Sequence, residues 1–226
     1  MPFSGHSGGQ GDSGRDAEAM MEFVLGLRSR GLSDVRVLKA VETLPRPLFV
    51  LPAHVAHAFD EVALPIQCGQ SITPPGLVAS IAERLAVTSD HRVLEIGTGS
   101  GYLTAVLGRL ARRVLTIDRW RLLITEAEER LRAVAITNVT MMVADGREGW
   151  PERGPYDRIV ATAAYETMPG ALIDQLAPLG RLILPLGPRG GQQMLVMVEK
   201  RETGAVESEF MPIRTAMIEK GVSARL

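Results

Sequence analysis

VLEIGTGSGYL, residues 93–103, is the stretch that decides the fold. Residues 93–96 form a mostly apolar run that is typical of a buried strand, and Gly97, Gly99 and Gly101 follow it at alternate positions. Glycine lets the chain turn sharply and lets a ligand approach main-chain atoms, because no Cβ stands in the way. A helical pattern comes next. The stretch therefore predicts a ligand-binding turn at the end of a buried strand.

Outward from this turn, strand-like and helix-like segments alternate. Strands are predicted at residues 92–96, 113–117, 139–143, 157–161 and 181–184, and helices begin at Tyr102, Arg119 and Gly170. Such alternation indicates a parallel sheet with helices on both faces. Two final strand-like runs, residues 192–200 and 205–214, are separated only by a turn and predict an antiparallel hairpin. The predicted class is α/β, a Rossmann-like doubly wound, mostly parallel sheet with an antiparallel C-terminal hairpin and an N-terminal helical cap.

The N-terminal third has a different pattern. Residues 1–15 are rich in Gly, Ser and Asp and predict a disordered tail, and residues 16–80 predict a cap before a cofactor-binding domain at 81–226. The cap begins with a helix from Ala17, whose stop is Gly31, and Ser33 is the predicted N-cap of a second helix. The proline-rich residues 46–75 predict extended chain around the core. A further helix is expected at residues 76–85. The first helix carries apolar residues at spacings of three and four: Met20, Met21, Phe23, Val24 and Leu27.

Composition narrows the classes of function. The 226 residues carry a net charge of −1, so no overall positive field attracts nucleic acid. The single cysteine, Cys68, cannot form an intramolecular disulfide, and no apolar run reaches the roughly 18 residues of a membrane span. We expect a cytoplasmic monomer with neither nucleic-acid nor membrane partners. His54 and His57 lack a third ligand nearby, so we expect no metal site.

Acidic residues follow three consecutive predicted strands. Glu95 precedes the glycines, Asp118 closes the second strand, and Asp145 with Gly146 follows the third. A dinucleotide-binding turn needs a small residue at the sixth position of GxGxxG, where this chain has Tyr102. The spacing resembles the GxGxG turn of class I methyltransferases instead. In that interpretation Glu95 meets the ligand's ammonium, directly or through water, Asp118 accepts the ribose hydroxyls, and Asp145 and Gly146 meet the adenine.

Each acid also has a purely structural interpretation. Glu95 could cap a helix, Asp118 could pair with Arg119 or Arg121, and Asp145 could begin a turn. The convergence of all three on one sheet edge favours the ligand site.

A wider resemblance covers residues 20–215. FDEVALPIQCGQSITPPGLVA, residues 59–79, is similar to the pattern of protein-L-isoaspartate O-methyltransferases, in which a Leu-Pro-Ile element precedes Gly-Gln-Thr-Ile-Ser and a proline. Further agreement comes from RPLFVLP at 46–52, PYDRIVATAA at 155–164, QLAPLGRLILPLG at 175–187 and PIR at 212–214. The chain departs from the pattern at Gln67, usually glycine, at Thr73, usually serine, and after Arg214.

The resemblance implies both the cofactor and the chemistry. It implies S-adenosyl-L-methionine, methyl transfer to the carboxylate of L-isoaspartyl residues in proteins or peptides, and repair through a succinimide. It places Thr73 beside the methyl acceptor, with Gln70, Ser71 and Ile72 as pocket wall. A carboxylate is already ionised at neutral pH, so no strong general base is needed, and Thr73 need only orient it.

Three other functions share parts of this pattern. The chain could methylate another carboxylate or a small molecule, or it could bind the cofactor without catalysis, as the departures at Gln67 and Thr73 would allow. An NAD enzyme conflicts with Tyr102. Cys68 lies beside the predicted pocket but lacks a base partner, which favours an inert residue.

Overall fold

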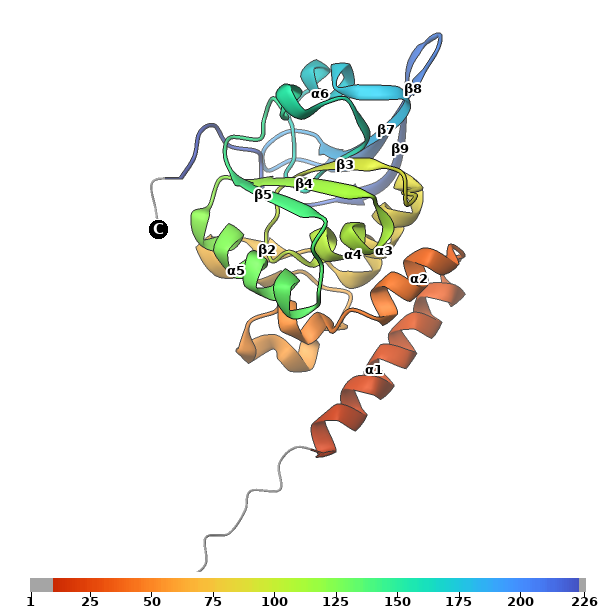
Figure 1. The fold of residues 1–226 in the computed structure, drawn as a ribbon, viewed down its shortest axis with the longest axis vertical. Coiled ribbons are helices and arrows are strands. Elements are labelled where there is room, and N and C mark those ends of the chain that lie inside the picture. Colours follow the sequence, from red (N-terminus) through yellow and green to blue (C-terminus); the bar gives the residue numbers. More distant parts are fainter. Residues whose placement is uncertain (1–9, 224–226) are drawn as a thin grey trace, which may run out of the picture.

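The computed structural model describes residues 10–223, with side chains from residue 18 onward. It is a three-layer α/β structure in which one sheet separates two groups of helices and loops (Figure 1). The α-helices are α1 Gln10–Ser29, α2 Val35–Glu42, α3 Pro75–Leu85, α4 Tyr102–Leu110, α5 Arg121–Ala133 and α6 Gly170–Asp174. The strands are β1 Leu64–Pro65, β2 Ser71–Ile72, β3 Arg92–Ile96, β4 Arg113–Asp118, β5 Val139–Val143, β6 Tyr156–Ala161, β7 Leu176–Leu186, β8 Gln193–Arg201 and β9 Gly204–Ile213.

The large sheet has seven strands in the order β5-β4-β3-β6-β7-β8-β9. The pairs from β5 through β7 are parallel, and β8 and β9 add antiparallel to the β7 edge. This arrangement confirms the predicted parallel sheet and its C-terminal hairpin. Because β3 and β6 are neighbours although β4 and β5 come between them in sequence, the strand order reverses between β3 and β6. A reversal of this kind leaves a crevice at the carboxyl ends of the strands.

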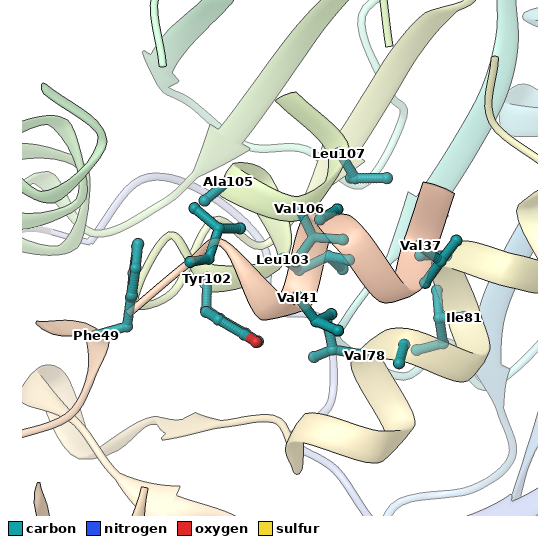
Figure 2. Close-up of a cluster of buried hydrophobic side chains, with 14 of the residues drawn as sticks. Val37, Val41, Phe49, Val78, Ile81, Tyr102, Leu103, Ala105, Val106 and Leu107 are labelled. Carbon is teal, nitrogen blue, oxygen red and sulfur yellow. The ribbon is translucent and has the colours of Figure 1, made fainter. Parts of the chain in front are cut away.

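Alternate residues of the strands enter different cores. On β3, Val93 belongs to the larger buried cluster, whereas Leu94 and Ile96 belong to the smaller one on the other face. The larger cluster joins the sheet to α1–α5, and α2, α3 and α4 pack together through Val41, Val78 and Val106 and their neighbours (Figure 2). The smaller cluster is covered by α6 and by connecting segments. Both faces are therefore covered, and most of the helical mass lies on one.

The N-terminal cap differs from the sequence-based expectation at the start of α1, at the N-cap of α2 and in residues 46–75. The expected tail at residues 1–15 lies partly outside the described residues, but Gln10–Arg15 belongs to α1. Extending an existing helix costs only propensity, since each added residue gains one hydrogen bond. The N-cap of α2 is Asp34 and not Ser33. The main-chain N–H of Ser33 donates instead to Glu83 Oε1, at 2.7 Å, so a tertiary contact decides between two suitable caps.

The expected extended segment, residues 46–75, is largely built of short 3₁₀ turns. These are η1 Arg46–Phe49, η2 Pro52–His57 and η3 Gln67–Gly69, with the two-residue hairpin of β1 and β2 around the last. η4 Pro151–Arg153 is a similar turn before β6. Proline is the first residue of η2 and η4 and the second of η1, where its missing N–H costs little. The segment wraps the core as predicted, but its backbone turns repeatedly.

Candidate active site

A cavity of about 510 Å³ lies at the carboxyl ends of the parallel strands. Its walls come from the loops after β3, β4, β5 and β6, from residues 70–74 and from residues 212–219. This is the crevice that the reversal of strand order creates.

The glycine turn between β3 and α4 forms one wall. Gly97, Gly99 and Gly101 all have positive φ, of 94°, 54° and 86°. Gly97 and Gly99 line the cavity, and a Cβ on Gly97 would lie 2.1 Å from Thr162 Oγ1. Gly101 does not line the cavity; a Cβ there would meet Ala127 of α5 at 2.9 Å. The first two glycines thus expose main chain to a ligand, and the third allows helix packing.

Asp118 lines the cavity at the end of β4. It is 7% exposed, and its carboxylate accepts hydrogen bonds from the main-chain N–H of Gly99 (2.9 Å) and of Trp120 (3.0 Å). Burial raises the pKa of this carboxyl above its ordinary value, against the opposing effect of these hydrogen bonds. No ion pair joins Asp118 to Arg119 or Arg121 within the described part of the chain. The carboxylate is held rigidly beside the glycine turn, with acceptor capacity left for a hydroxyl ligand.

The 70–75 loop, which ends at the start of α3, forms the opposite wall. Gln70, Ser71, Ile72 and Thr73 all line the cavity, as the sequence predicts. Pro74 and Pro75 follow and begin α3. The Thr73 hydroxyl makes no hydrogen bond with any described residue, whereas its carbonyl accepts one from Arg46 Nη2, at 2.7 Å. The cavity therefore combines a glycine turn, a buried carboxylate and a free hydroxyl.

Comparison with known proteins assigns this arrangement to a family. The family model described as protein-L-isoaspartate(D-aspartate) O-methyltransferase matches residues 18–215. The chain belongs to this family. Protein-L-isoaspartate O-methyltransferases of Xanthobacter autotrophicus and Azorhizobium caulinodans are 49% and 46% identical to it, over 96% and 95% of this chain and 99% of each relative. The sequence-based resemblance is confirmed, and the chain is a methyltransferase.

Two solved structures agree with the fold. A protein-L-isoaspartate O-methyltransferase superimposes with a TM-score of 0.79 at 25% identity, over 89% of this chain and 66% of that longer chain. A Plasmodium falciparum structure with the same family name, in complex with S-adenosyl-L-homocysteine, gives a TM-score of 0.76 over 88% and 97% of the two chains. At 20% identity the second likeness supports the fold alone.

The family uses S-adenosyl-L-methionine, and the cavity of this methyltransferase fits that cofactor. Its volume suits a nucleoside with an amino-acid chain, Gly97 and Gly99 leave room for it, and Asp118 offers oxygens for hydroxyls. Gly146 also lines the cavity, and a Cβ on it would meet Ile96 Cγ2 at 2.9 Å. Eight of the predicted site residues thus surround one space: Gln70, Ser71, Ile72, Thr73, Gly97, Gly99, Asp118 and Gly146.

Glu95 is not among the residues that line the cavity, and its predicted contact with the cofactor, directly or through water, stays a prediction. Its side chain is fully buried and lies against α4, where its Oε2 accepts from Thr104 Oγ1 at 2.6 Å. Burial raises the pKa of Glu95 to about 8, so the carboxyl is mostly protonated at neutral pH. Strand alternation is the reason: Glu95 shares the face of Val93, which α4 covers, and does not point past the strand end.

Asp145 is also outside the cavity wall. Its carboxylate accepts hydrogen bonds from the main-chain N–H of Gly221 (2.7 Å) and of Arg147 (3.0 Å), and these contacts lower its pKa against a raising effect of burial. Asp145 therefore anchors the C-terminal segment, residues 214–223, which lines the cavity between Arg214 and Glu219. The turn expected at Asp145 exists, but its side chain serves a distant part of the chain.

Several wall residues were not predicted from the sequence. Thr162 directly follows β6 and Trp120 is the second residue after β4, and position after a parallel strand is the signal that could have found them. Arg189 and Arg214 also line the cavity, and neither makes an ion pair or hydrogen bond with a described residue. Their place in the wall depends on how the β8–β9 hairpin and the C-terminal segment pack against the rest of the chain, and the local sequence pattern does not indicate this packing.

The other candidate residues of the sequence, His54, His57 and Cys68, do not line the cavity. Within residues 18–223, no cluster of three metal-ligating side chains occurs, and His57 Nδ1 contacts Asp60 Oδ2 at 2.7 Å. Burial raises the pKa of the Cys68 thiol, which disfavours the reactive thiolate. No helix of the described chain is long and apolar enough to cross a bilayer.

Proposed function

We propose that this methyltransferase transfers a methyl group from S-adenosyl-L-methionine to the free carboxylate of L-isoaspartyl residues in proteins or peptides. The proposal is supported by its family and by one observation: Thr73, whose hydroxyl has no hydrogen-bond partner among the described residues, lines the same cavity as the glycine turn and Asp118. The relatives named above carry the isoaspartate activity in their names.

The site residues divide into a cofactor wall and an acceptor wall. Main-chain groups of Gly97 and Gly99 hold the amino-acid part of the cofactor, Asp118 accepts its ribose hydroxyls, and Gly146 leaves space for its adenine. When bound, the cofactor supplies a methyl group on a positive sulfur. Gln70, Ser71 and Ile72 complete the wall on the side of Thr73. Three further residues hold the elements around the cavity in place: Glu95 bonds to Thr104 of α4, Gly101 allows close packing against α5, and Asp145 bonds to Gly221 of the C-terminal segment.

Chemistry in this cavity needs positioning more than acid or base catalysis. The acceptor carboxylate is ionised at neutral pH, and Thr73 would donate a hydrogen bond that fixes one of its oxygens and leaves the other free to take the methyl group. The bond between sulfur and methyl would break as the ester bond forms, with S-adenosyl-L-homocysteine as the leaving group. Arg189 and Arg214 attract the anionic acceptor and favour release of the neutral ester. After release, the adjacent main-chain amide nitrogen attacks the ester carbonyl and expels methanol. The resulting succinimide hydrolyses in part to normal aspartate.

Paired peptides that differ only in aspartate or isoaspartate test the proposal. With methyl-labelled cofactor, we expect base-labile label on the isoaspartyl peptide alone. Thr73→Val keeps the shape but removes the hydroxyl, and should lower kcat/KM about 10- to 100-fold, the worth of one hydrogen bond to a charged group. Thr73→Ser is the matched control and should retain activity. Label on neither peptide, with the cofactor bound, would point to another acceptor or to a noncatalytic module.

We also propose that the enzyme acts as a cytoplasmic monomer. The lone Cys68, which cannot form an intramolecular disulfide, supports the reducing setting. Sedimentation of the purified protein at micromolar concentration should give the mass of one chain, and a dimer mass would contradict the proposal.

A further inference from the structure

Arg46 is the largest fully buried side chain of the structure, and it lies directly behind the acceptor wall. We propose that Arg46 is a positioning residue for methyl transfer: its guanidinium fixes the main chain of the 70–75 loop so that the Thr73 hydroxyl has one orientation in the cavity. This inference rests on the role proposed for Thr73.

The contacts of Arg46 join three parts of the chain. Its Nη2 donates to the carbonyl oxygen of Thr73 at 2.7 Å, and its Nε donates to the carbonyl oxygen of Ala58 at 2.6 Å. The guanidinium carbon lies 4.4 Å from the ring centroid of Tyr102, the first residue of α4 and itself part of the cavity wall. One side chain thus links the cap, the 70–75 loop and the helix that follows the glycine turn.

Main-chain N–H groups contribute little to fixing the 70–75 loop directly after Thr73. Pro74 and Pro75 have no main-chain N–H, so the residues after Thr73 cannot donate hydrogen bonds until Gly76, whose N–H reaches Glu61 Oε2 at 3.1 Å. β2 contributes only a two-residue pairing with β1. Buried Ile72 and the Pro74 carbonyl, which accepts from the Val78 N–H at 3.1 Å, fix the chain on either side, and the hydrogen bond to Arg46 fixes the carbonyl of Thr73 itself.

A packing role alone would not require a cation at this position. Burying a charged group costs free energy that an apolar side chain of similar size avoids, unless its hydrogen bonds are needed. Burial lowers the pKa of Arg46 to about 10, which still leaves the guanidinium protonated at neutral pH. Two charge-assisted hydrogen bonds to main-chain carbonyls fix a loop more tightly than apolar contacts do, because they specify direction as well as distance.

A double-mutant cycle between Arg46→Lys and Thr73→Val tests the inference. Lysine keeps the charge but cannot reach both carbonyls in the fork geometry of arginine. We expect Arg46→Lys to lower kcat at least tenfold, since misplacement of a catalytic group by about 1 Å can cost roughly 100-fold. The Kd for S-adenosyl-L-homocysteine should change by less than about twofold. In the Thr73→Val background the same substitution should cost less than about twofold, because the hydroxyl is already absent.

Two controls separate positioning from general stability. Arg36→Lys changes an exposed arginine that pairs with Asp34 in the same cap, and it should leave kcat unchanged. If the buried lysine prevents Arg46→Lys from folding, Arg46→Gln, which buries no charge, replaces it in the double-mutant cycle with Thr73→Val. An equal loss of kcat in both Thr73 backgrounds, or full kcat in Arg46→Lys, would overturn the inference. A wild-type enzyme that ignores isoaspartyl peptide would refute the proposed function instead.

Discussion

Asp118 shows how a single residue defines the cofactor wall. Two main-chain N–H groups fix its carboxylate, and its burial makes any hydrogen bond to a ligand strong. In the wild type each carboxylate oxygen of Asp118 accepts a hydrogen bond from a main-chain N–H group. Asp118→Asn replaces one of these oxygens by an amide NH₂ group, which can only donate and therefore loses that hydrogen bond. We expect the Kd for S-adenosyl-L-homocysteine to rise about 10- to 100-fold by calorimetry. Asp90→Asn, at an exposed position, should leave the Kd unchanged.

Glu95 is the residue whose charge state depends most on the fold. Its pKa is about 8 in the folded protein against 4.5 for an exposed glutamate, so the native state holds a proton that the unfolded state releases between these values. The contribution of Glu95 to the free energy of unfolding should therefore be highest below pH 4.5. Its contribution should fall by up to about 1.4 kcal/mol per pH unit as pH rises towards 8.

Glu95→Gln tests this titration because glutamine resembles the protonated acid. In urea unfolding from pH 5 to 8, the variant should lack the fall that Glu95 produces in the wild type. Its Kd for S-adenosyl-L-homocysteine should stay within about threefold of the wild-type value, since Glu95 does not line the cavity. Glu128→Gln, at an exposed glutamate of α5, is the control and should keep the wild-type slope. A large loss of affinity in Glu95→Gln would support the predicted contact between Glu95 and the ammonium of the cofactor.

At the scale of elements, the glycine turn between β3 and α4 also sets the distance to α5. Gly101 and Gly31 have similar φ, 86° and 91°, but a Cβ on Gly101 meets α5 whereas a Cβ on Gly31 meets nothing within 4 Å. Gly31→Ala should therefore cost about 1–2 kcal/mol of backbone strain alone. Gly101→Ala should cost about 1–3 kcal/mol more through overpacking, as measured by urea unfolding. Equal losses would show that α5 adjusts without penalty.

At the scale of the whole molecule, the cap and the sheet share one core. The larger buried cluster includes Phe23 of α1, Phe49 of η1, Val78 of α3 and Leu195 of β8. We propose that residues 16–80 and 81–226 have different roles, cap and cofactor binding, but unfold together. Heat or urea should give one transition by every probe. S-adenosyl-L-homocysteine at 100 times its Kd should add about 2.7 kcal/mol to the unfolding free energy. A separate early transition of the cap would contradict a shared core.

The sequence by itself determined the parallel strands, the C-terminal hairpin and most of the cofactor wall. The period of the apolar residues located β3–β6, and the glycines at 97 and 99, Asp118 and the 70–73 pattern identified residues that do surround one cavity. These signals are readable because parallel strands end at one edge, so local position along each strand predicts proximity there.

Only the tertiary structure decided which side chains reach that cavity. Glu95 and Asp145 have the right residue type and sequence position, but strand alternation turns the first towards α4, and the C-terminal segment occupies the second. No local pattern predicts Arg46 as a site residue, because its partners Ala58 and Thr73 are 12 and 27 residues away in the sequence. Direction and long-range partners follow from packing, which requires the whole chain to be folded.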